Sequence, residues 1–147
     1  MNASTRPSAN VASWLAGPRG RIASFAWGAA EASFFFLVPD ILLSLVALTA
    51  PRRVWGHLAA AMAGALLVGA LMYQWSVNTP SARTSVAAVP RVSTSMFDQA
   101  DKDLRTHGAW GAVFGPARGI PYKVYAVQAP RHAITLAAFV AASVPAR

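Results

Sequence analysis

Apolar residues dominate four blocks of this chain, and short polar segments separate the blocks. The blocks are residues 22–50, 54–75, 108–130 and 133–147. Residues 1–21 form a polar N-terminal segment, and residues 76–107 form a polar loop between the second and third blocks. Apolar runs of about 20 residues are typical of helices that cross a bilayer. The pattern therefore predicts an all-α membrane protein.

The second block, residues 54–75, has the length of one transmembrane helix. Aromatic side chains, which prefer the headgroup level of a membrane, stand near its two ends: Trp55, Tyr73 and Trp75. Small residues recur at every fourth position and allow another helix to approach closely; they are Ala61, Ala65 and Gly69. We predict a transmembrane helix here.

The first block, residues 22–50, has basic residues on both of its flanks: Arg19, Arg21, Arg52 and Arg53. A single crossing would leave one basic flank outside, whereas both flanks favour the cytoplasm. A re-entrant hairpin, which enters and leaves the membrane on one side, satisfies both flanks. We predict its turn at Pro39, because proline lacks an amide donor and forces Val38 out of helical geometry.

The third block repeats this pattern. Non-helical backbone at membrane depth must be buried in protein or line a watery cavity, so the first hairpin needs a partner. Residues 108–130 again contain two apolar arms around a Gly/Pro-rich break, and another apolar block follows. That last block, residues 133–147, is too short to cross a bilayer, so we expect either a truncated membrane helix or a last helix that stops inside the membrane. We predict two re-entrant helical hairpins plus transmembrane helices in an inverted repeat, the arrangement of many transporters.

Four charged residues fall at the two breaks and are the candidate site. Glu31 and Asp40 belong to the first break, and Arg118 and Lys123 to the second. Ionisable residues inside a membrane are costly and are functional candidates. Our hypothesis is that Glu31 or Asp40 carries a coupling proton, since burial favours the neutral acid and a nearby cation favours the carboxylate.

Arg118 and Lys123 are the candidate anion-binding residues. A guanidinium offers a planar fork to a phosphate, and an ammonium offers a point charge. A structural alternative stays open, in which the acids and bases of the two breaks only neutralise one another. We expect Gly119 and Pro121, like Pro39, to shape the hairpin turns.

Composition supports a membrane protein over a soluble one. Of 147 residues, 55% are hydrophobic and 12% charged, about half the charged share of an average soluble domain. The net charge is +8, but the arginines stand singly or in pairs between apolar blocks. We therefore assign them to the ends of membrane segments rather than to nucleic-acid binding. The chain has no cysteine, which excludes disulfides and thiolate metal ligands.

The polar loop ends in a segment, residues 96–107, that predicts a short amphipathic helix. Its apolar residues share one face: Met96, Ala100 and Leu104. Its charged residues form two i,i+4 pairs, Asp98 with Lys102 and Asp101 with Arg105. We interpret its three aspartates, Asp103 included, as surface charges. An interfacial helix and a solvated connector helix remain equal alternatives.

The acidic first break and the run GPARGIPYK, residues 115–123, resemble the DedA family of membrane proteins with the SNARE-associated (VTT) domain. The position of the basic residue Lys123, two residues after Pro121, resembles the YqaA-like branch of that family. The resemblance covers residue 22 to the C-terminus. It implies facing hairpins in a multi-pass protein of the bacterial inner membrane. It further implies proton-dependent transport and movement of lipids such as undecaprenyl phosphate between leaflets.

The sequence lacks the common catalytic signatures. It contains no G-x-S-x-G elbow, no HExxH and no metal-ligand spacing, so we predict neither an enzyme nor a cofactor or metal. The expected partners are membrane lipids, with an anionic lipid or a small solute as substrate, and a homo-oligomer stays open. Two other functions also stay open: an assembly or membrane-homeostasis factor without transport, and an intramembrane acid/base enzyme.

Overall fold

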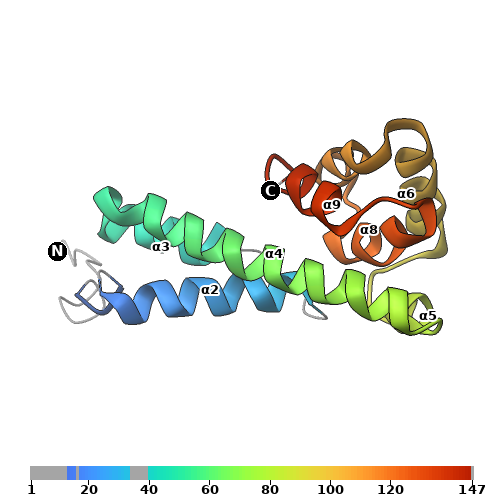
Figure 1. The fold of residues 1–147 in the computed structure, drawn as a ribbon. Helices are drawn as coiled ribbons and strands as arrows, with labels where there is room; N and C mark the ends of the chain where they lie inside the picture. Colours follow the sequence, from blue (N-terminus) through green and yellow to red (C-terminus); the bar gives the residue numbers. More distant parts are fainter. Residues whose placement is uncertain (1–12, 16, 34–39, 147) are drawn as a thin grey trace, which may run out of the picture.

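The computed structural model describes residues 13–15, 17–33 and 40–146, and every regular element in this part of the chain is helical. The all-α prediction is confirmed for these residues. Figure 1 shows an elongated molecule in which α2 (Pro18–Ala32), α3 (Asp40–Thr49) and the first half of α4 (Val54–Asn78) form one end. The helices that follow α4 gather beside its second half.

Helix α2 begins four residues earlier than the first apolar block. Gly17 precedes it in an extended conformation, and Pro18 stands in its first turn. Proline is favoured there because its fixed φ suits a helix and its missing amide has no partner in the first turn. The helix ends at Ala32, and the amide of Ser33 donates to the carbonyl of Ala29 (3.1 Å). The predicted turn at Pro39 lies outside the described residues.

Pro51 separates α3 from α4. A short 3-10 turn, η1 (Pro51–Arg53), joins the two helices. Helix α4 then runs for 25 residues, three beyond the predicted block, and at 1.5 Å per residue it is about 37 Å long. The segment Pro51–Asn78 is the one helix among the described residues that is long and apolar enough to cross a membrane.

Helices α2 and α4 lie parallel and in close contact. The Arg21 side chain lies beside Gly56 near the start of α4, whereas Gly28, about two turns further along α2, packs on Ala61 of α4. A Cβ added to Gly28 would overlap the Ala61 carbonyl oxygen. The predicted close approach of another helix at the small-residue stripe is therefore confirmed at Ala61.

The second half of the chain forms a compact helical cluster along α4. Its elements are α5 (Ala82–Ala87), α6 (Thr94–His107), η2 (Gly108–Phe114), α7 (Gly115–Arg118), α8 (Tyr122–Gln128), η3 (Ala129–His132) and α9 (Leu136–Ser143). The largest side chains of its core are Phe97, Leu104, Tyr125 and Phe139. The α9 helix has only eight residues, about 12 Å, so it is shorter than the last apolar block.

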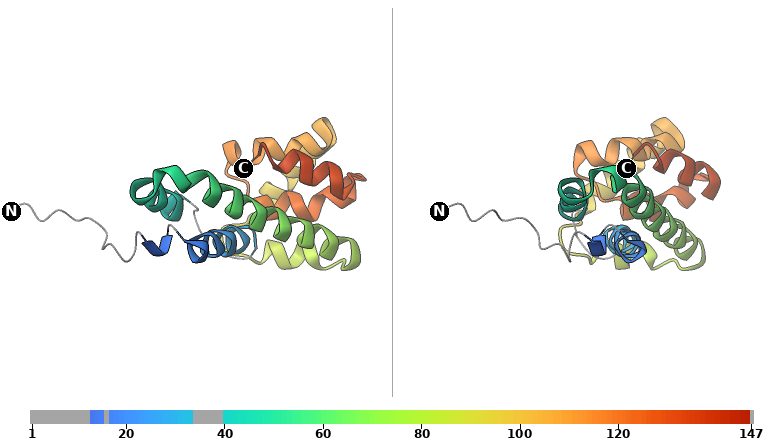
Figure 2. Two further views of the ribbon diagram at one scale, coloured as in Figure 1. Left: turned by 60° about the vertical axis from the view of Figure 1, so that its left-hand side comes forward. Right: turned by 90° about the vertical axis from the view of Figure 1, so that its left-hand side faces the viewer.

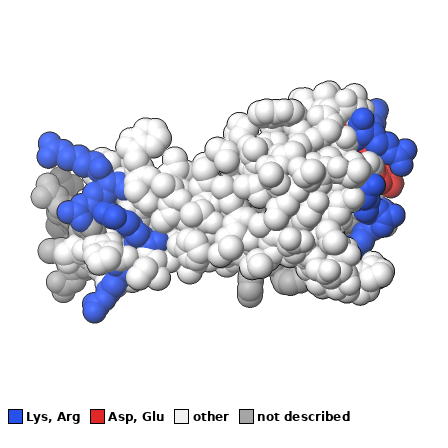
Figure 3. All heavy atoms as spheres, viewed as in Figure 1, with Lys and Arg blue, Asp and Glu red and all other residues white. Residues whose placement is uncertain are grey.

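Charged side chains collect at the two ends of the molecule. On the face shown in Figure 3, the Lys and Arg side chains lie at either end, and the surface between them carries no charge. Acidic side chains accompany the basic ones only at the end formed by the second half of the chain. The uncharged surface between the ends runs along α4.

Candidate functional site

Glu31, the described acid of the first break, and the second break both lie near the middle of α4. Glu31 stands in the last turn of α2, two residues after Ala29, whose backbone packs on Gly64. From the other side, the ring of Tyr122 occupies the space left by the missing side chain of Gly69. Leu66, the middle residue of α4, lies between these two contact points.

The second break is a tight turn between two short helices. Gly119 ends α7 with φ +67°, a left-handed conformation that glycine adopts without steric cost. The amide of Ile120 donates to the carbonyl of Gly115 (2.9 Å). Pro121 is extended and directly precedes α8, as suits a residue that cannot donate a backbone hydrogen bond.

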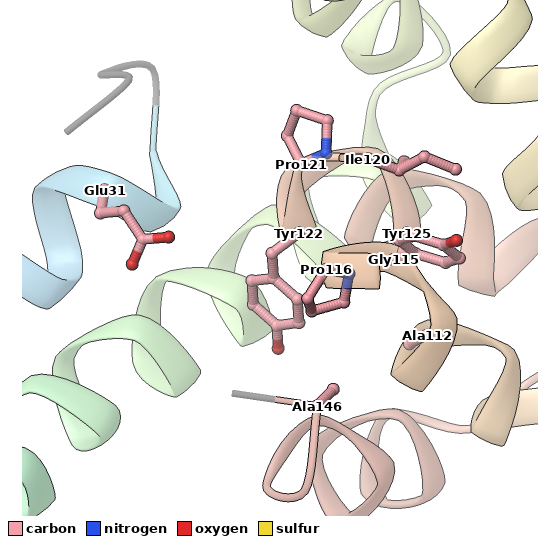
Figure 4. Close-up of a pocket in the computed structure, with 9 residues that line it drawn as sticks. All are labelled: Glu31, Ala112, Gly115, Pro116, Ile120, Pro121, Tyr122, Tyr125 and Ala146. Atoms are coloured by element: carbon pink, nitrogen blue, oxygen red, sulfur yellow. The ribbon is translucent and has the colours of Figure 1, made fainter. Parts of the chain in front are cut away.

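A cavity of about 250 Å³ separates Glu31 from this turn. The residues that line it are Glu31, Ala112, Gly115, Pro116, Ile120, Pro121, Tyr122, Tyr125 and Ala146. Figure 4 shows the Glu31 carboxylate directed toward Tyr122 and the second break. Apart from Glu31, the lining residues are uncharged and belong to the second half of the chain. The Glu31 carboxylate therefore faces a mostly apolar surface.

Lys123 brings a positive charge close to this cavity. It follows Tyr122 in α8 and is 2% exposed. Its ammonium has no hydrogen-bond partner among the described residues, and the charge of Glu31 acts on it. Lys123 thus lies within electrostatic range of Glu31, although it is not among the residues that line the cavity. The side chain of Asp40, at the start of α3, lies outside the described part of the chain.

Arg118 lies in a different cluster. Its guanidinium pairs with Asp103 on α6 and lies 5.1 Å above the Phe114 ring, while the side chain stays 41% exposed. Among the described residues, the ion pair of Arg118 is therefore with Asp103 and not with Glu31 of the first break. Its partner comes from the polar loop, because α6 packs directly on η2 and α8.

Asp103 is buried, which corrects its interpretation as a surface charge. Besides Arg118, the Tyr125 hydroxyl (2.8 Å) and the Gln99 amide (2.9 Å) donate to its carboxylate. Burial alone would raise the pKa of Asp103, but these three hydrogen bonds and the Arg118 charge hold it below its ordinary value. Asp103 is thus an ionised carboxylate with partners on both sides of the second break.

Asp101 forms a second set of contacts between the same elements. It accepts from the Gln128 amide (2.7 Å) and lies 2.8 Å from Nε2 of His132. It therefore contacts the end of α8 and η3 instead of pairing with Arg105. The sequence indicated these contacts only weakly. Asp101 and Asp103 are direct neighbours of Ala100 and Leu104, which form the buried face of α6.

A buried polar pair between α2 and α4 was also missed. Ser24 and His57 are completely buried, with Ser24 Oγ 2.8 Å from His57 Nδ1. The Ser24 hydroxyl also lies 3.1 Å from the Gly20 carbonyl. This pair connects the two helices and does not line the cavity beside Glu31.

No protein-family model matches the chain, and neither a curated protein nor a solved structure does.

Proposed function

We propose that this chain is a multi-pass membrane protein that moves an anionic lipid or a small anionic solute across the bilayer, coupled to protons. The observation that carries this proposal is a cavity lined by Glu31 of α2 and Tyr122 of α8, with buried Lys123 next to Tyr122 in the chain and subject to the charge of Glu31. An acid and a base from two distant segments meet near the middle of the longest apolar helix. Ionisable side chains at such depth are typical of transport pathways.

Membrane embedding is supported by the length of α4 and by the uncharged surface along it. Arg21 and Arg53 mark the same end of α4, so the segment from α2 to α3 enters and leaves at that end. The last turns of α4 and helix α6 lie at the other end. There His132 lies 2.8 Å from Asp101 of α6, and the Tyr73 hydroxyl of α4 donates to the carbonyl of Ile134 (2.7 Å). The two segments thus become re-entrant hairpins of opposite orientation.

The proposed coupling uses the balance of charge at the cavity. With Glu31 ionised, its carboxylate compensates the buried Lys123 ammonium. With Glu31 protonated, the ammonium loses this compensation and attracts a substrate anion, because a buried unpaired charge is costly. Arg118, held by Asp103 but partly exposed, is available as a second contact for a phosphate at the edge of the site.

The acidic first break and residues 115–123 of the second break resemble the DedA family. We propose on this basis that the protein belongs to the YqaA-like branch and resides in a bacterial inner membrane. A polyprenyl phosphate or an anionic phospholipid is then the preferred class of substrate.

Reconstitution of the purified full chain in liposomes tests the proposal. The probes are a fluorescent short-chain prenyl phosphate and fluorescent phosphatidylglycerol, each assayed with and without a pH gradient. We expect the gradient to accelerate movement between leaflets and Glu31→Gln to reduce the rate at least tenfold. Asp98→Asn, which neutralises an exposed acid on α6, is the matched control and should retain the rate.

The same assay separates the alternatives. Equal rates for Glu31→Gln and the unmodified protein would contradict the proton-coupling role. If neither probe moves while Glu31→Gln lowers only the abundance of the protein in cells, an assembly factor is the better assignment. Chemical conversion of a labelled lipid in detergent, where no second compartment exists, would indicate an enzyme.

A further inference from the structure

We infer that one end of the molecule binds the headgroups of anionic phospholipids. This surface, the arginine end, consists of four exposed residues: Arg19, Arg21, Arg52 and Arg53. The inference rests on the proposed membrane embedding of α4 but not on transport.

Parallel packing brings these arginines together. Arg19 and Arg21 stand in the first turn of α2, and Arg52 and Arg53 immediately precede α4. The Arg21 side chain reaches Gly56, with its Nε 3.7 Å from the position of an added Cβ. Two segments more than 30 residues apart in sequence therefore present four guanidinium groups at one end (Figure 3).

No nearby acid compensates these charges. Glu31 and Asp40 are the only acidic residues before residue 98. Glu31 lies ten residues beyond Arg21 in the same helix, about 15 Å away along its axis. Asp40 stands at the opposite end of α3 from η1. The arginine end therefore carries an uncompensated positive charge.

The opposite end of the molecule differs in this respect. Acidic residues accompany its cations, and Arg118 pairs with Asp103. Helix α6 carries acidic residues beside basic ones: Asp98, Asp101, Lys102 and Arg105. Figure 3 shows acidic side chains among the basic ones there. The arginine end is therefore the end at which basic side chains stand without acidic ones among them.

Apolar side chains beside the arginines point to a lipid rather than to a soluble polyanion. Trp55 is 76% exposed, Trp14 45% and Leu48 84%, and all three flank the arginine end in sequence. Tryptophan rings prefer the headgroup level of a membrane, and arginines there attract anionic lipids. A nucleic acid would leave these apolar side chains in water. The partner that satisfies both groups is a leaflet rich in anionic phospholipid.

Native mass spectrometry of the full chain in detergent tests this inference. The protein is incubated with equimolar phosphatidylglycerol and phosphatidylcholine, and the lipid adducts are counted. We expect phosphatidylglycerol to be preferred. Arg52→Gln/Arg53→Gln should reduce this preference about tenfold or more, because each arginine near an anionic surface contributes about a fivefold change. Added salt should weaken the preference, since exposed charges are screened.

Two controls make the result specific. Arg52→Lys/Arg53→Lys keeps the charge and should retain most of the preference. Lys102→Gln/Arg105→Gln removes two exposed charges from α6 and should leave it unchanged. Equal binding of both lipids to the unmodified protein, or equal losses in the two Gln pairs, would overturn the inference. Glu31→Gln, which tests transport, should leave the preference intact, so the two proposals fail independently.

Discussion

The hydroxyl oxygen of Ser24 lies 2.8 Å from Nδ1 of His57, and both side chains are completely buried between α2 and α4. Nε2 of His57 has no hydrogen-bond partner among the described residues. When the Ser24 hydroxyl donates to the Gly20 carbonyl, Nδ1–H of His57 donates to Ser24 and Nε2 becomes a bare acceptor. The pair therefore connects the two helices through one hydrogen bond in an apolar contact.

Removal of the serine hydroxyl tests this bond. We expect Ser24→Ala to lower the free energy of unfolding by about 1 kcal/mol, because it leaves a buried histidine nitrogen unpaired. A double-mutant cycle with His57→Leu, followed by unfolding in detergent, should give a coupling energy of about 0.6 kcal/mol, the average for hydrogen bonds between membrane helices. Additive effects of the two substitutions would show that the hydrogen bond contributes nothing.

Two glycines allow a matched test of the α2–α4 contact. A Cβ at Gly28 would overlap the backbone of Ala61, whereas the nearest atom to a Cβ at Gly56 is the flexible Arg21 Nε at 3.7 Å. Gly28→Ala should therefore destabilise the protein by about 1–3 kcal/mol. Gly56→Ala should stabilise it by up to about 1 kcal/mol, as expected for an open helix position. Unfolding temperatures in detergent that shift in the same direction would contradict the packing.

Asp103 should make stability depend on pH. Its folded-state pKa lies below the ordinary value, so its contribution is complete above the unfolded pKa of about 4 and is lost as pH falls through the folded value. We expect Asp103→Asn to lower the unfolding temperature at pH 7 and to flatten its decline in acid. Asp98→Asn, at an exposed position on α6, should change neither property.

We expect the buried ammonium of Lys123 to lower the stability of the folded protein, because its proposed role is in transport. Its ammonium is buried without a hydrogen bond among the described residues, and the attraction of Glu31 does not fully offset the cost of burying it. We expect Lys123→Met to be at least as stable as the unmodified protein in thermal unfolding. The same variant should lose movement of the anionic probe in liposomes. A large loss of stability would instead assign a structural role to the ammonium.

Gly119 requires a left-handed backbone, with φ +67°, but has open space around the position of a Cβ. Gly119→Ala should therefore cost about 1–2 kcal/mol through backbone strain alone. Gly119→Asn should cost less, since asparagine tolerates this conformation better. Unfolding measurements on both variants check this order, and equal losses would point to a steric cause.

Several features of the fold follow from local sequence alone. Residues 54–75 are apolar for long enough to predict α4. Gly119 and Pro121 predict the second break, because one tolerates positive φ and the other cannot donate a backbone hydrogen bond. The small residues of α4 predicted a close helix partner. These features depend on neighbours in the chain, so composition and spacing are sufficient to predict them.

Other features depended on which distant segments pack together. Asp103 has the same local surroundings as an exposed aspartate, but α8 and α7 bring Tyr125 and Arg118 to it and make its burial favourable. Ser24 and His57 are 33 residues apart and meet only because α2 and α4 run parallel. The sequence identified Glu31 and Lys123 as charges within apolar blocks. Tertiary structure alone decided that Lys123 rather than Arg118 lies near Glu31, because the energy of a buried charge depends on its partners in space.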